Sequence, residues 1–360
     1  MFFALLCAVM LAPACARKSE PPAATSSALH SADDGAFKYT ITTDLDTQKD
    51  NIEILVGMNT VNGQYPVKYD LDCEGDGDFE YKDLTDNKKC IYKKNSGKHQ
   101  IWVRGEISAM ILCARRPDGV NCEPDLSDDK NKELLCIAPV GLDDSKDAVI
   151  SIDSWGNVAW KSMEGFAAIC TALEKIPEDN PDLRQVKSMN WMFSGATSFN
   201  QPLEKWDVSK VTDMEGMFSG AKSFNQPLEK WDVSKVTNMA GMIFGALLFN
   251  QPLEKWNVSN VTDMFRMFSV AKSFNQPLEA WNVSNVTDME AMFSGASSFN
   301  QPLEKWNVSK VTNMNEMFKD AKAFSHYPKS WVIPEDNSED MFTGAIVEAE
   351  AKKKTMLQMV

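Results

Sequence analysis

Residues 199–223 read FNQPLEKWDVSKVTDMEGMFSGAKS, and Phe224 begins nearly the same 25 residues again. The FNQPL block starts at Phe199, Phe224, Phe249, Phe274 and Phe299, and tryptophans recur in step with it, at Trp206, Trp231, Trp256, Trp281, Trp306 and Trp331. A fixed period of this length is typical of units that cannot bury a core alone and therefore stack on one another. The sequence thus predicts an array of stacked 25-residue coils.

Within each unit the apolar residues follow leucine-rich-repeat spacing with substitutes. Residues 203–214 have the pattern L-x-x-W-x-V-x-x-V-x-x-M, in which Trp206 and Val208 are two apart, as on one face of a strand. Thr212 and Glu215 form a capping box, which starts a helix. The residues expected to close the interior of the coil are Val211, Met214, Met217, Phe218, Ala221 and Phe224. We expect an α/β leucine-rich-repeat-like solenoid whose coils each contain a short strand and a short helical turn.

A glycine stands where this helical turn should end in four units, at Gly195, Gly220, Gly245 and Gly295. Glycine is the usual residue at a left-handed helix end because it has no Cβ. Val270 and Asp320 take its place in two other units. Degenerate units at both ends of the array are expected to act as caps, since a stack needs polar outer faces.

The chain begins with MFFALLCAVMLAPACARKSE, an apolar run of signal-peptide length that then turns polar. It is too short to cross a bilayer as a helix, which needs about 20 residues. Ala12 and Ala14 form a cleavage pattern, and Cys15 stands where a bacterial lipoprotein carries its lipid. We expect export with lipidation at Cys15 as one outcome; an unprocessed N-terminal helix is the alternative.

Between this segment and the array, short alternating apolar stretches such as FKYTITT, IEILVGM and HQIWVRGEI are separated by Asp, Asn and Gly. This pattern predicts a small all-β sandwich. The expected organisation is a signal peptide at 1–15, a flexible linker at 16–36, the sandwich with its disulfides at 37–150, a degenerate N-terminal capping repeat at 151–185, the solenoid at 186–345 and a C-terminal tail at 346–360.

Six cysteines follow the signal segment, and all precede the regular units. An even set in an exported chain predicts disulfide bonds. Proximity in the sequence favours the pairs Cys73 with Cys90, Cys113 with Cys122, and Cys136 with Cys170, although other pairings are possible. Zinc is the competing interpretation, but the sequence has no C-x-x-C pair and no Cys/His cluster to support it.

The segment YDLDCEGDGDFEYKD concentrates carboxylates around a Gly turn, with Asp72, Glu74, Asp76 and Asp78 as candidate calcium ligands. An acidic turn between two strands explains the same residues without a metal, and we favour it because Cys73 lies inside the segment and no flanking helices are predicted. We expect no cofactor, with calcium as the alternative.

The net charge of -14 disfavours nucleic acid and anionic lipid as partners, because both are bound by clustered Lys and Arg. The chain has 3 histidines and no G-x-S-x-G, H-E-x-x-H or phosphate-loop motif. We therefore expect a protein without enzymatic activity.

The largest departures from the repeat are apolar residues in two neighbouring units: Phe244, Leu247, Leu248, Phe265 and Val270. If exposed, these side chains form a possible contact patch. Local repacking of the core is the alternative interpretation.

The stretch MFSGATSFNQPLEKWDVSKVTDM resembles the repeat of the BspA-like leucine-rich-repeat surface proteins of bacteria, and YDLDCEGDGDFEY through GKHQIWVRGEI is similar to a polycystic-kidney-disease (PKD/Ig-like) sheet module. The resemblance implies a cell-surface or outer-membrane lipoprotein, or a secreted one. It also implies adhesion to a protein or glycan on host or neighbouring cells, and it carries no catalytic residue over. Attachment to a membrane would be through the signal or lipid anchor only. A passive envelope or spacer protein without a ligand is the alternative function.

Overall fold

The computed structural model describes residues 36–42, 51–58, 69–75, 81–84, 88–93, 97–105, 109–111, 134–139, 149–333 and 338–348. All of them belong to one compact unit, Asp33–Val360. The predicted signal peptide with Cys15 and the predicted linker up to residue 35 lie outside the described residues, as does the tail from residue 349. In the described part, no helix is long and apolar enough to cross a membrane.

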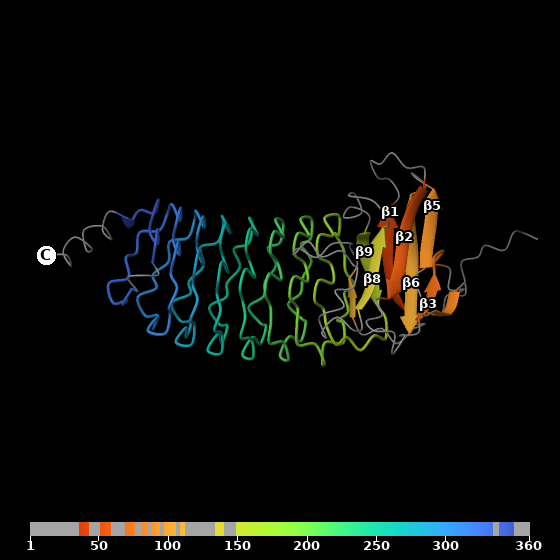
Figure 1. Cartoon of the computed structure of the whole chain (residues 1–360), viewed down its shortest axis with the longest axis horizontal. Coiled ribbons are helices and arrows are strands. Elements are labelled where there is room, and N and C mark those ends of the chain that lie inside the picture. Colours follow the sequence, from red (N-terminus) through yellow and green to blue (C-terminus); the bar gives the residue numbers. More distant parts are fainter. Residues whose placement is uncertain are drawn as a thin grey trace, which may run out of the picture. The chain divides into compact units, whose positions relative to one another are not determined.

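Nine strands within the described residues form two sheets. Figure 1 shows several of them as labelled arrows. The strands are β1 (Phe37–Thr42), β2 (Asn51–Met58), β3 (Tyr69–Asp72), β4 (Tyr81–Leu84), β5 (Lys88–Lys93), β6 (Lys98–Gly105), β7 (Ala109–Ile111), β8 (Leu134–Pro139) and β9 (Val149–Trp155). The five-stranded sheet has the order β4-β3-β6-β1-β9, and the four-stranded sheet has the order β5-β2-β8-β7. Strand pairs are antiparallel except β7 with β8, which is parallel.

The alternation in the sequence FKYTIT explains how β1, which lies between β6 and β9, contributes to the core. Phe37, Tyr39 and Ile41 are buried, whereas the intervening Lys38 and Thr40 are only partly covered. Successive side chains of a strand point to opposite faces, so every second residue of β1 enters the core.

Strand β9 joins the sheet to the repeat array. It pairs with β1 on one edge, and on its other edge Ser151 forms a parallel bridge with Lys175 of the first coil. The Ile152 N–H donates to the Lys175 carbonyl at 3.0 Å. The boundary expected at residue 150 therefore falls inside a strand that bonds to both parts.

From residue 156 to 333 the chain runs through successive coils that repeat at 25-residue intervals (Figure 1). One residue per coil forms a parallel bridge to the equivalent residue of the next coil, in the order Ser188, Asp213, Asn238, Asp263, Asp288 and Asn313. Between residues 156 and 333 the backbone contains no helix and no longer strand. Where a short strand and a helical turn are expected, each unit has a single bridged residue and a series of turns.

Hydrogen bonding between coils explains why the expected helix does not form. In residues 189–196 alternate N–H groups bond in two directions. Met192 N–H donates back to Met189 within the coil at 3.2 Å, whereas Phe193 N–H donates forward to Met217 of the next coil at 2.8 Å. An α-helix would direct every N–H four residues back along its own axis. Half of these donors instead bind one coil to the next.

This alternation requires two left-handed residues per coil, four positions apart. The expected glycine is one of them, with φ of 69° at Gly195 and 68° at Gly220. The other is four residues earlier, at Trp191 (φ 57°) and Gly216 (φ 57°), and the sequence analysis does not anticipate it. Val270 also adopts a left-handed conformation, with φ 58°, although it is β-branched.

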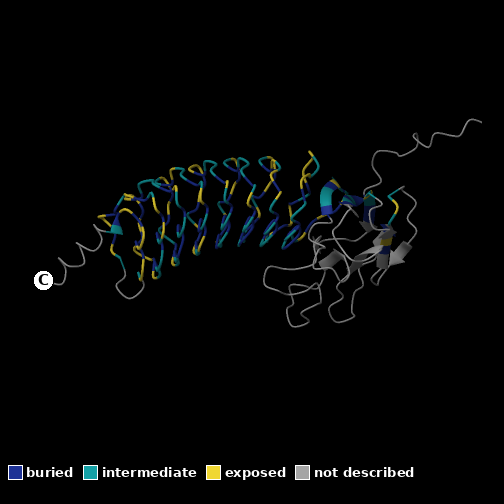
Figure 2. Ribbon diagram, turned by 90° about the horizontal axis from the view of Figure 1, so that it is seen from above, coloured by how far each residue is buried: buried dark blue, intermediate teal, exposed yellow. Residues whose placement is uncertain are grey.

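The interior of the array is filled by aligned side chains of the same kind. The segments of the coils that carry buried residues are dark blue in the ribbon of Figure 2. Phe224 lies 6.0 Å, centroid to centroid, from both Phe199 and Phe249 in the adjacent coils, and 4.1 Å from Phe218 in its own coil. Such offset ring stacks are favourable beyond the apolar area that they bury. The repeated Met and Phe residues thus form the core.

Thr212 does not cap a helix as its sequence context suggests. Its hydroxyl donates to the Lys187 carbonyl of the preceding coil at 3.2 Å, and Thr237 repeats this contact with Thr212. The neighbouring Asp213 accepts the Glu215 N–H at 3.2 Å. The residues of the expected capping box therefore make separate contacts: Thr212 bonds to the preceding coil, and Glu215 takes part in a local turn with Asp213.

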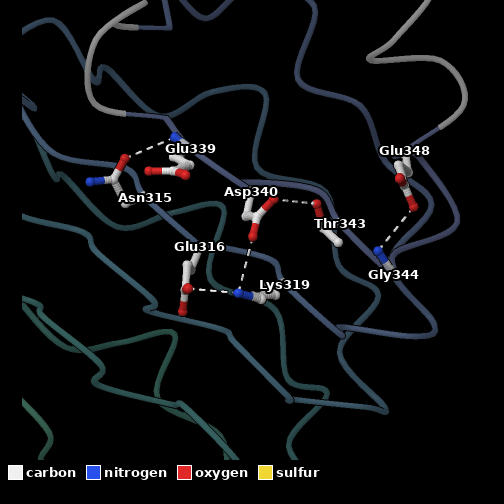
Figure 3. Close-up of polar contacts among 8 residues, drawn as sticks. All are labelled: Asn315, Glu316, Lys319, Glu339, Asp340, Thr343, Gly344 and Glu348. Carbon is white, nitrogen blue, oxygen red and sulfur yellow. Dashed lines mark hydrogen bonds and ion pairs between the residues drawn. The ribbon is translucent and has the colours of Figure 1, made fainter.

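The C-terminal end of the array is closed by a shortened coil. Phe342 stacks on Phe318 at 5.6 Å, and Lys319 forms ion pairs with Glu316 at 2.6 Å and with Asp340 at 3.1 Å (Figure 3). Hydrogen bonds to the Asp340 carboxylate, from Lys319 first and from the Thr343 hydroxyl next, hold the pKa of Asp340 below its ordinary value. Polar contacts thus fix the last coil where the apolar spacing is one residue short.

Candidate functional site

One face of the array carries most of the differences between units. It is formed by the four residues of each M-x-x-M-F-x-x-A segment that lie between the constant Met, Phe and Ala positions, and we call it the variable face. Its members in successive coils are Asn190, Trp191, Ser194 and Gly195; Glu215, Gly216, Ser219 and Gly220; Ala240, Gly241, Phe244 and Gly245; Phe265, Arg266, Ser269 and Val270; Glu290, Ala291, Ser294 and Gly295; and Asn315, Glu316, Lys319 and Asp320. Most of these residues are partly exposed, whereas Ser194, Gly216, Ala240, Ser269 and Ala291 are buried. Charged, aromatic and small residues alternate here at equivalent positions.

Apart from Leu247 and Leu248, which replace Lys222 and Ser223 of the preceding coil, other exposed positions change less. The residue after each tryptophan is Asp207 or Asp232 in two coils and Asn257 in the next. In all of these coils its side-chain oxygen accepts an N–H two residues later, for example from Ser209 at 3.0 Å and Ser259 at 3.2 Å. Asp and Asn perform this turn contact equally well, so the position varies only between the two.

The FNQPL block is constant because its amides connect the coils. The Asn250 side-chain oxygen accepts the Asn275 N–H at 2.9 Å and the Gln276 side-chain amide at 3.0 Å. The Asn250 N–H in turn donates to Asn225 at 2.9 Å. Because each side chain completes its neighbour's hydrogen bonding, a change in one coil would leave unpaired groups in the next.

The tryptophans are held in the same way. The Trp256 indole N–H donates to the Leu228 carbonyl at 2.9 Å, and Trp281 repeats the contact with Leu253. On the variable face, in contrast, adjacent coils are joined mainly through backbone groups. Its side chains are therefore free to differ without loss of the stack.

The structure brings two of the predicted patch residues together around Gly241. The Gly241 N–H donates to the Phe265 carbonyl at 2.7 Å, and the Phe244 Cβ lies beside Gly241, within 3.8 Å of where a Cβ on that glycine would stand. Both phenylalanines are partly exposed. They replace Ser219 and Glu215 of the preceding coils, so the variable face becomes apolar at this point.

The other three predicted residues are more dispersed. Leu247 and Leu248 follow on the same coil as Phe244, beyond buried Ala246, and Leu248 is 56% exposed. Val270 is partly buried, and its side chain lies beside Gly295 of the next coil. Phe244 and Phe265 thus belong to adjacent coils and both border Gly241, Leu248 is an exposed neighbour of Phe244 in sequence, and Val270 fills space over a glycine.

Trp191, a partly buried residue of the variable face two coils before Phe244, is not among the residues predicted from the sequence. Its ring lies over Gly216, where an added Cβ would clash with the indole. A comparison of equivalent positions would have found it, since no other unit has an aromatic residue at the position of Trp191.

The variable face is bordered by carboxylates on neighbouring coils. Burial raises the pKa of Asp263 above its ordinary value, and the nearby Asp288 and Asp213 carboxylates raise it further. Burial likewise raises the pKa of Glu215. Asp263 and Asp288 are bridge partners, so two like charges stand side by side on adjacent coils.

Amides separate the carboxylates elsewhere along this border. Asn238 donates its side-chain N–H to Glu215 at 3.3 Å, and Asn313 donates to Glu290 at 2.8 Å. Asp263 accepts only the backbone N–H of Phe265, at 2.8 Å, among the hydrogen bonds of the described residues. Asp263, which accepts no side-chain amide in the described part of the chain, is therefore beside the aromatic residue Phe265.

Outside the variable face, exposed ion pairs connect coils: Lys230 with Glu204, Lys255 with Glu229, and Lys305 with Glu279, at 2.9–3.1 Å. Ala280 interrupts this row. Exposed pairs of this kind contribute little to stability.

The structure contains the disulfide Cys73–Cys90, the first of the three expected pairs. Cys170 is also disulfide-bonded. The side chains of Cys113, Cys122 and Cys136 lie outside the described residues, as do Asp76, Asp78 and the side chain of Asp72. Within the described part, no group of three or more His, Cys, Asp or Glu side chains could hold a metal. Glu74 is exposed.

Comparison with curated proteins and with solved structures finds no match. The family model described as "Mycoplasma protein of unknown function, DUF285" matches residues 161–271 and 248–354. The two matches overlap and together cover 161–354, which is more than half of the 360 residues and contains every regular coil. The chain therefore belongs to the DUF285 family.

Proposed function

We propose that this protein is a non-enzymatic, cell-surface binding protein of the BspA-like leucine-rich-repeat type, which engages a protein or glycan through its variable face. The observation that carries the proposal is the concentration of chemical variety at the variable face, with Leu247 and Leu248 beside it in sequence. The constant positions are held by contacts between coils, whereas these residues can differ without loss of the stack and are therefore available for contacts with a ligand.

The proposed architecture is a leucine-rich-repeat-like solenoid preceded by a PKD/Ig-like sheet domain. Parallel bridges at 25-residue intervals and the aligned core support this interpretation. Stacked arrays offer a long surface to which several coils contribute, which suits the recognition of a macromolecule.

The experiment compares the full mature chain with a variant in which patch residues are replaced by those of neighbouring coils: Phe244→Ser, Leu247→Lys, Leu248→Ser and Phe265→Glu. These residues already occupy the equivalent positions in the same fold, at Ser219, Lys222, Ser223 and Glu215. Both proteins are screened against matrix proteins, mucins and glycan arrays. Binding by the natural chain that the variant loses supports the proposal.

The alternative is a spacer protein that sets reach at the cell surface without a ligand. It predicts no binding in the screen by either protein. Binding that is equal in the natural chain and the variant would place the contact surface elsewhere on the molecule.

Surface attachment is proposed to follow export, with lipidation at Cys15 as the anchor. Metabolic labelling with a fatty acid checks this point, because a Cys15→Ser variant should lose both the label and the membrane fraction. A labelled Cys15→Ser protein would contradict it.

Calcium is retained as a possible ligand of the acidic segment containing Asp72, Glu74, Asp76 and Asp78. A metal that binds only the folded state raises the melting temperature by mass action. A melting temperature that is the same in excess calcium and in chelator would remove calcium from the proposal.

A further inference from the structure

The apolar part of the variable face has a distinct electrostatic surrounding. Phe265 is two residues from Asp263, on which it depends for its N–H contact at 2.8 Å. Asp288 is the bridge partner of Asp263 on the next coil, and Glu290 follows Asp288 by two residues, as Phe265 follows Asp263. Phe265 thus lies two residues from one carboxylate, and the next coil places two more carboxylates at the register positions equivalent to Asp263 and Phe265.

The polar partners of these carboxylates leave their charge largely unopposed. Asp288 accepts the Glu290 N–H at 2.8 Å and an Asn313 amide at 3.4 Å, and Glu290 accepts the same amide at 2.8 Å. All of these donors are neutral. Among the described residues no cation forms an ion pair with Asp263, Asp288 or Glu290.

Arg266 is the cation of this region that lies on the variable face, and its guanidinium group faces the Phe265 ring. Its guanidinium carbon lies 4.7 Å from the centroid of the Phe265 ring. A cation at this distance is attracted to the ring face, so the structure itself shows that the Phe265 ring and its surroundings accept a positive group.

From this arrangement we infer that the Phe265 region of the variable face binds a segment of a partner protein in which Lys or Arg residues flank apolar side chains. The apolar side chains lie against Phe244 and Phe265, and the cations lie against Asp263, Asp288 and Glu290. This inference rests on the proposed function and names the chemistry of its ligand.

Charge complementarity favours this occupant over the others. An acidic segment would add to the repulsion between Asp263 and Asp288, and an anionic membrane surface would be repelled in the same way. An uncharged apolar segment would leave the carboxylates partly desolvated without a partner, which costs free energy. A cationic amphipathic segment satisfies both halves of the surface.

The test uses the full mature chain and three labelled peptides of equal length, read by fluorescence anisotropy. One alternates Lys with Leu, one alternates Glu with Leu, and one alternates Lys with Ser. The Lys–Leu peptide should bind on the order of tenfold more tightly than either of the others, since it alone supplies both kinds of contact. Its affinity should fall as salt rises, because exposed charges are screened.

Variants taken from neighbouring coils separate a specific contact from general attraction to an acidic protein. Phe265→Glu introduces the residue of Glu215 and Glu290, and it makes the face more acidic while removing the ring. It should weaken Lys–Leu binding on the order of tenfold. Binding that is unchanged or tighter in this variant would overturn the inference, because charge alone would then be the cause.

Arg266→Ala introduces the residue of Ala291 and removes the cation that competes for the ring. It should tighten Lys–Leu binding by about two- to fivefold. Asp288→Asn, which introduces the residue of Asn238 and Asn313, should weaken it by about the same factor. The matched control, Asp232→Asn, removes a carboxylate elsewhere on a coil and should change nothing.

The outcomes also separate this inference from the proposed function. If the Glu–Leu peptide or a glycan binds and Phe265→Glu removes that binding, the variable face is a binding surface and only the cationic ligand is wrong. If no peptide binds and the screen of matrix proteins, mucins and glycans is negative too, both are wrong.

Discussion

Val270 is one of two β-branched residues with a left-handed conformation in the described part of the chain, the other being Ile169 (φ 55°). Its equivalents Gly195, Gly220, Gly245 and Gly295 adopt the same conformation without a Cβ, whereas Val270 holds φ at 58° with a branched side chain. A left-handed L-residue costs roughly 1–2 kcal/mol because its Cβ crowds the following carbonyl. The stack tolerates this cost because backbone hydrogen bonds to both neighbouring coils fix the chain there.

Val270→Gly should therefore stabilise the protein. Relief of the crowding outweighs the greater freedom that glycine has in the unfolded chain, and the expected gain is about 0.5–1 kcal/mol. Urea unfolding measures it. The reverse change, Gly220→Val at φ 68°, should destabilise by more than this gain. A lower stability of Val270→Gly would show that the packing of Val270 on Gly295 matters more than its backbone.

Asn250 tests the amide connection between coils. Asn250→Ala removes the acceptor of Asn275 N–H and of the Gln276 side chain, and the expected loss is about 1–3 kcal/mol for the unpaired groups. Asn250→Asp keeps an acceptor oxygen in place and should lose less. Equal losses in urea unfolding would contradict this role of the side-chain oxygen.

At the scale of one element, the bridged column from Ser188 to Asn313 shows how far the sequence could be interpreted. The period and the inward positions could be predicted, because identical units must make identical contacts. The direction of the backbone hydrogen bonds could not. A Thr-Asp start followed by spaced apolar residues favours a helix locally, and only the neighbouring coil offers the carbonyls that draw alternate N–H groups outward.

The second left-handed position escaped prediction for a related reason. The residues at this position share no side-chain property, because backbone hydrogen bonds between coils impose the conformation. They include Trp191, Gly216, Gly241, Arg266 and Ala291. The candidate patch was partly predictable, since departures from a repeat are visible in the sequence. The sequence could not predict that Phe244 and Phe265 both border Gly241. It also could not predict that Val270 packs on a glycine of the next coil.

The carboxylate column gives stability a dependence on pH. The pKa of Asp263 is raised in the folded state by burial first and by Asp288 and Asp213 next. A raised carboxyl pKa means that the ionised form opposes folding. This penalty is present above the folded pKa and disappears as pH falls below the ordinary value of 3.8.

Asp263→Asn should accordingly stabilise the protein at pH 7, by about 0.2–1 kcal/mol, since Asn can still accept the Phe265 N–H as Asn238 does for Ala240. The gain should vanish near pH 3. Asp232→Asn should behave in the opposite way, because the Ser234 contacts lower the pKa of Asp232 and its charge favours the folded state. Thermal unfolding across this pH range measures both, and a pH-independent gain would contradict the assignment.

At the scale of the whole molecule, the sheet domain and the array share one hydrophobic core. Trp155 at the end of β9 connects them. Its ring lies 5.5 Å from that of Trp206 and 5.8 Å from that of Phe166, and its indole N–H donates to the Asp179 carbonyl at 3.1 Å. Residue spacing alone assigns the N-terminal cap to the degenerate repeat, but a residue of the sheet completes it.

Trp155→Ala should cost about 3–5 kcal/mol, as expected for a fully buried aromatic residue. Hydrogen exchange should show the loss mainly in the coils near Trp206, with residues 281–330 protected as before, because each coil contacts only its neighbours. Trp155→Phe keeps part of the ring contacts and should be intermediate. A uniform loss of protection along the array would mean that it unfolds as a single cooperative unit.

Each coil offers the next coil the same amides, indole N–H and hydroxyl that it receives from the one before. The regular units are therefore interchangeable parts: a gene that gained or lost one block of 25 codons between Trp206 and Trp306 would encode a longer or shorter molecule in which every joint between neighbours is intact. Recombination between such similar blocks can change the length of the array. It can also change which coils lie next to the exceptional ones. In each case the encoded protein can still fold, because the joints between coils are unchanged.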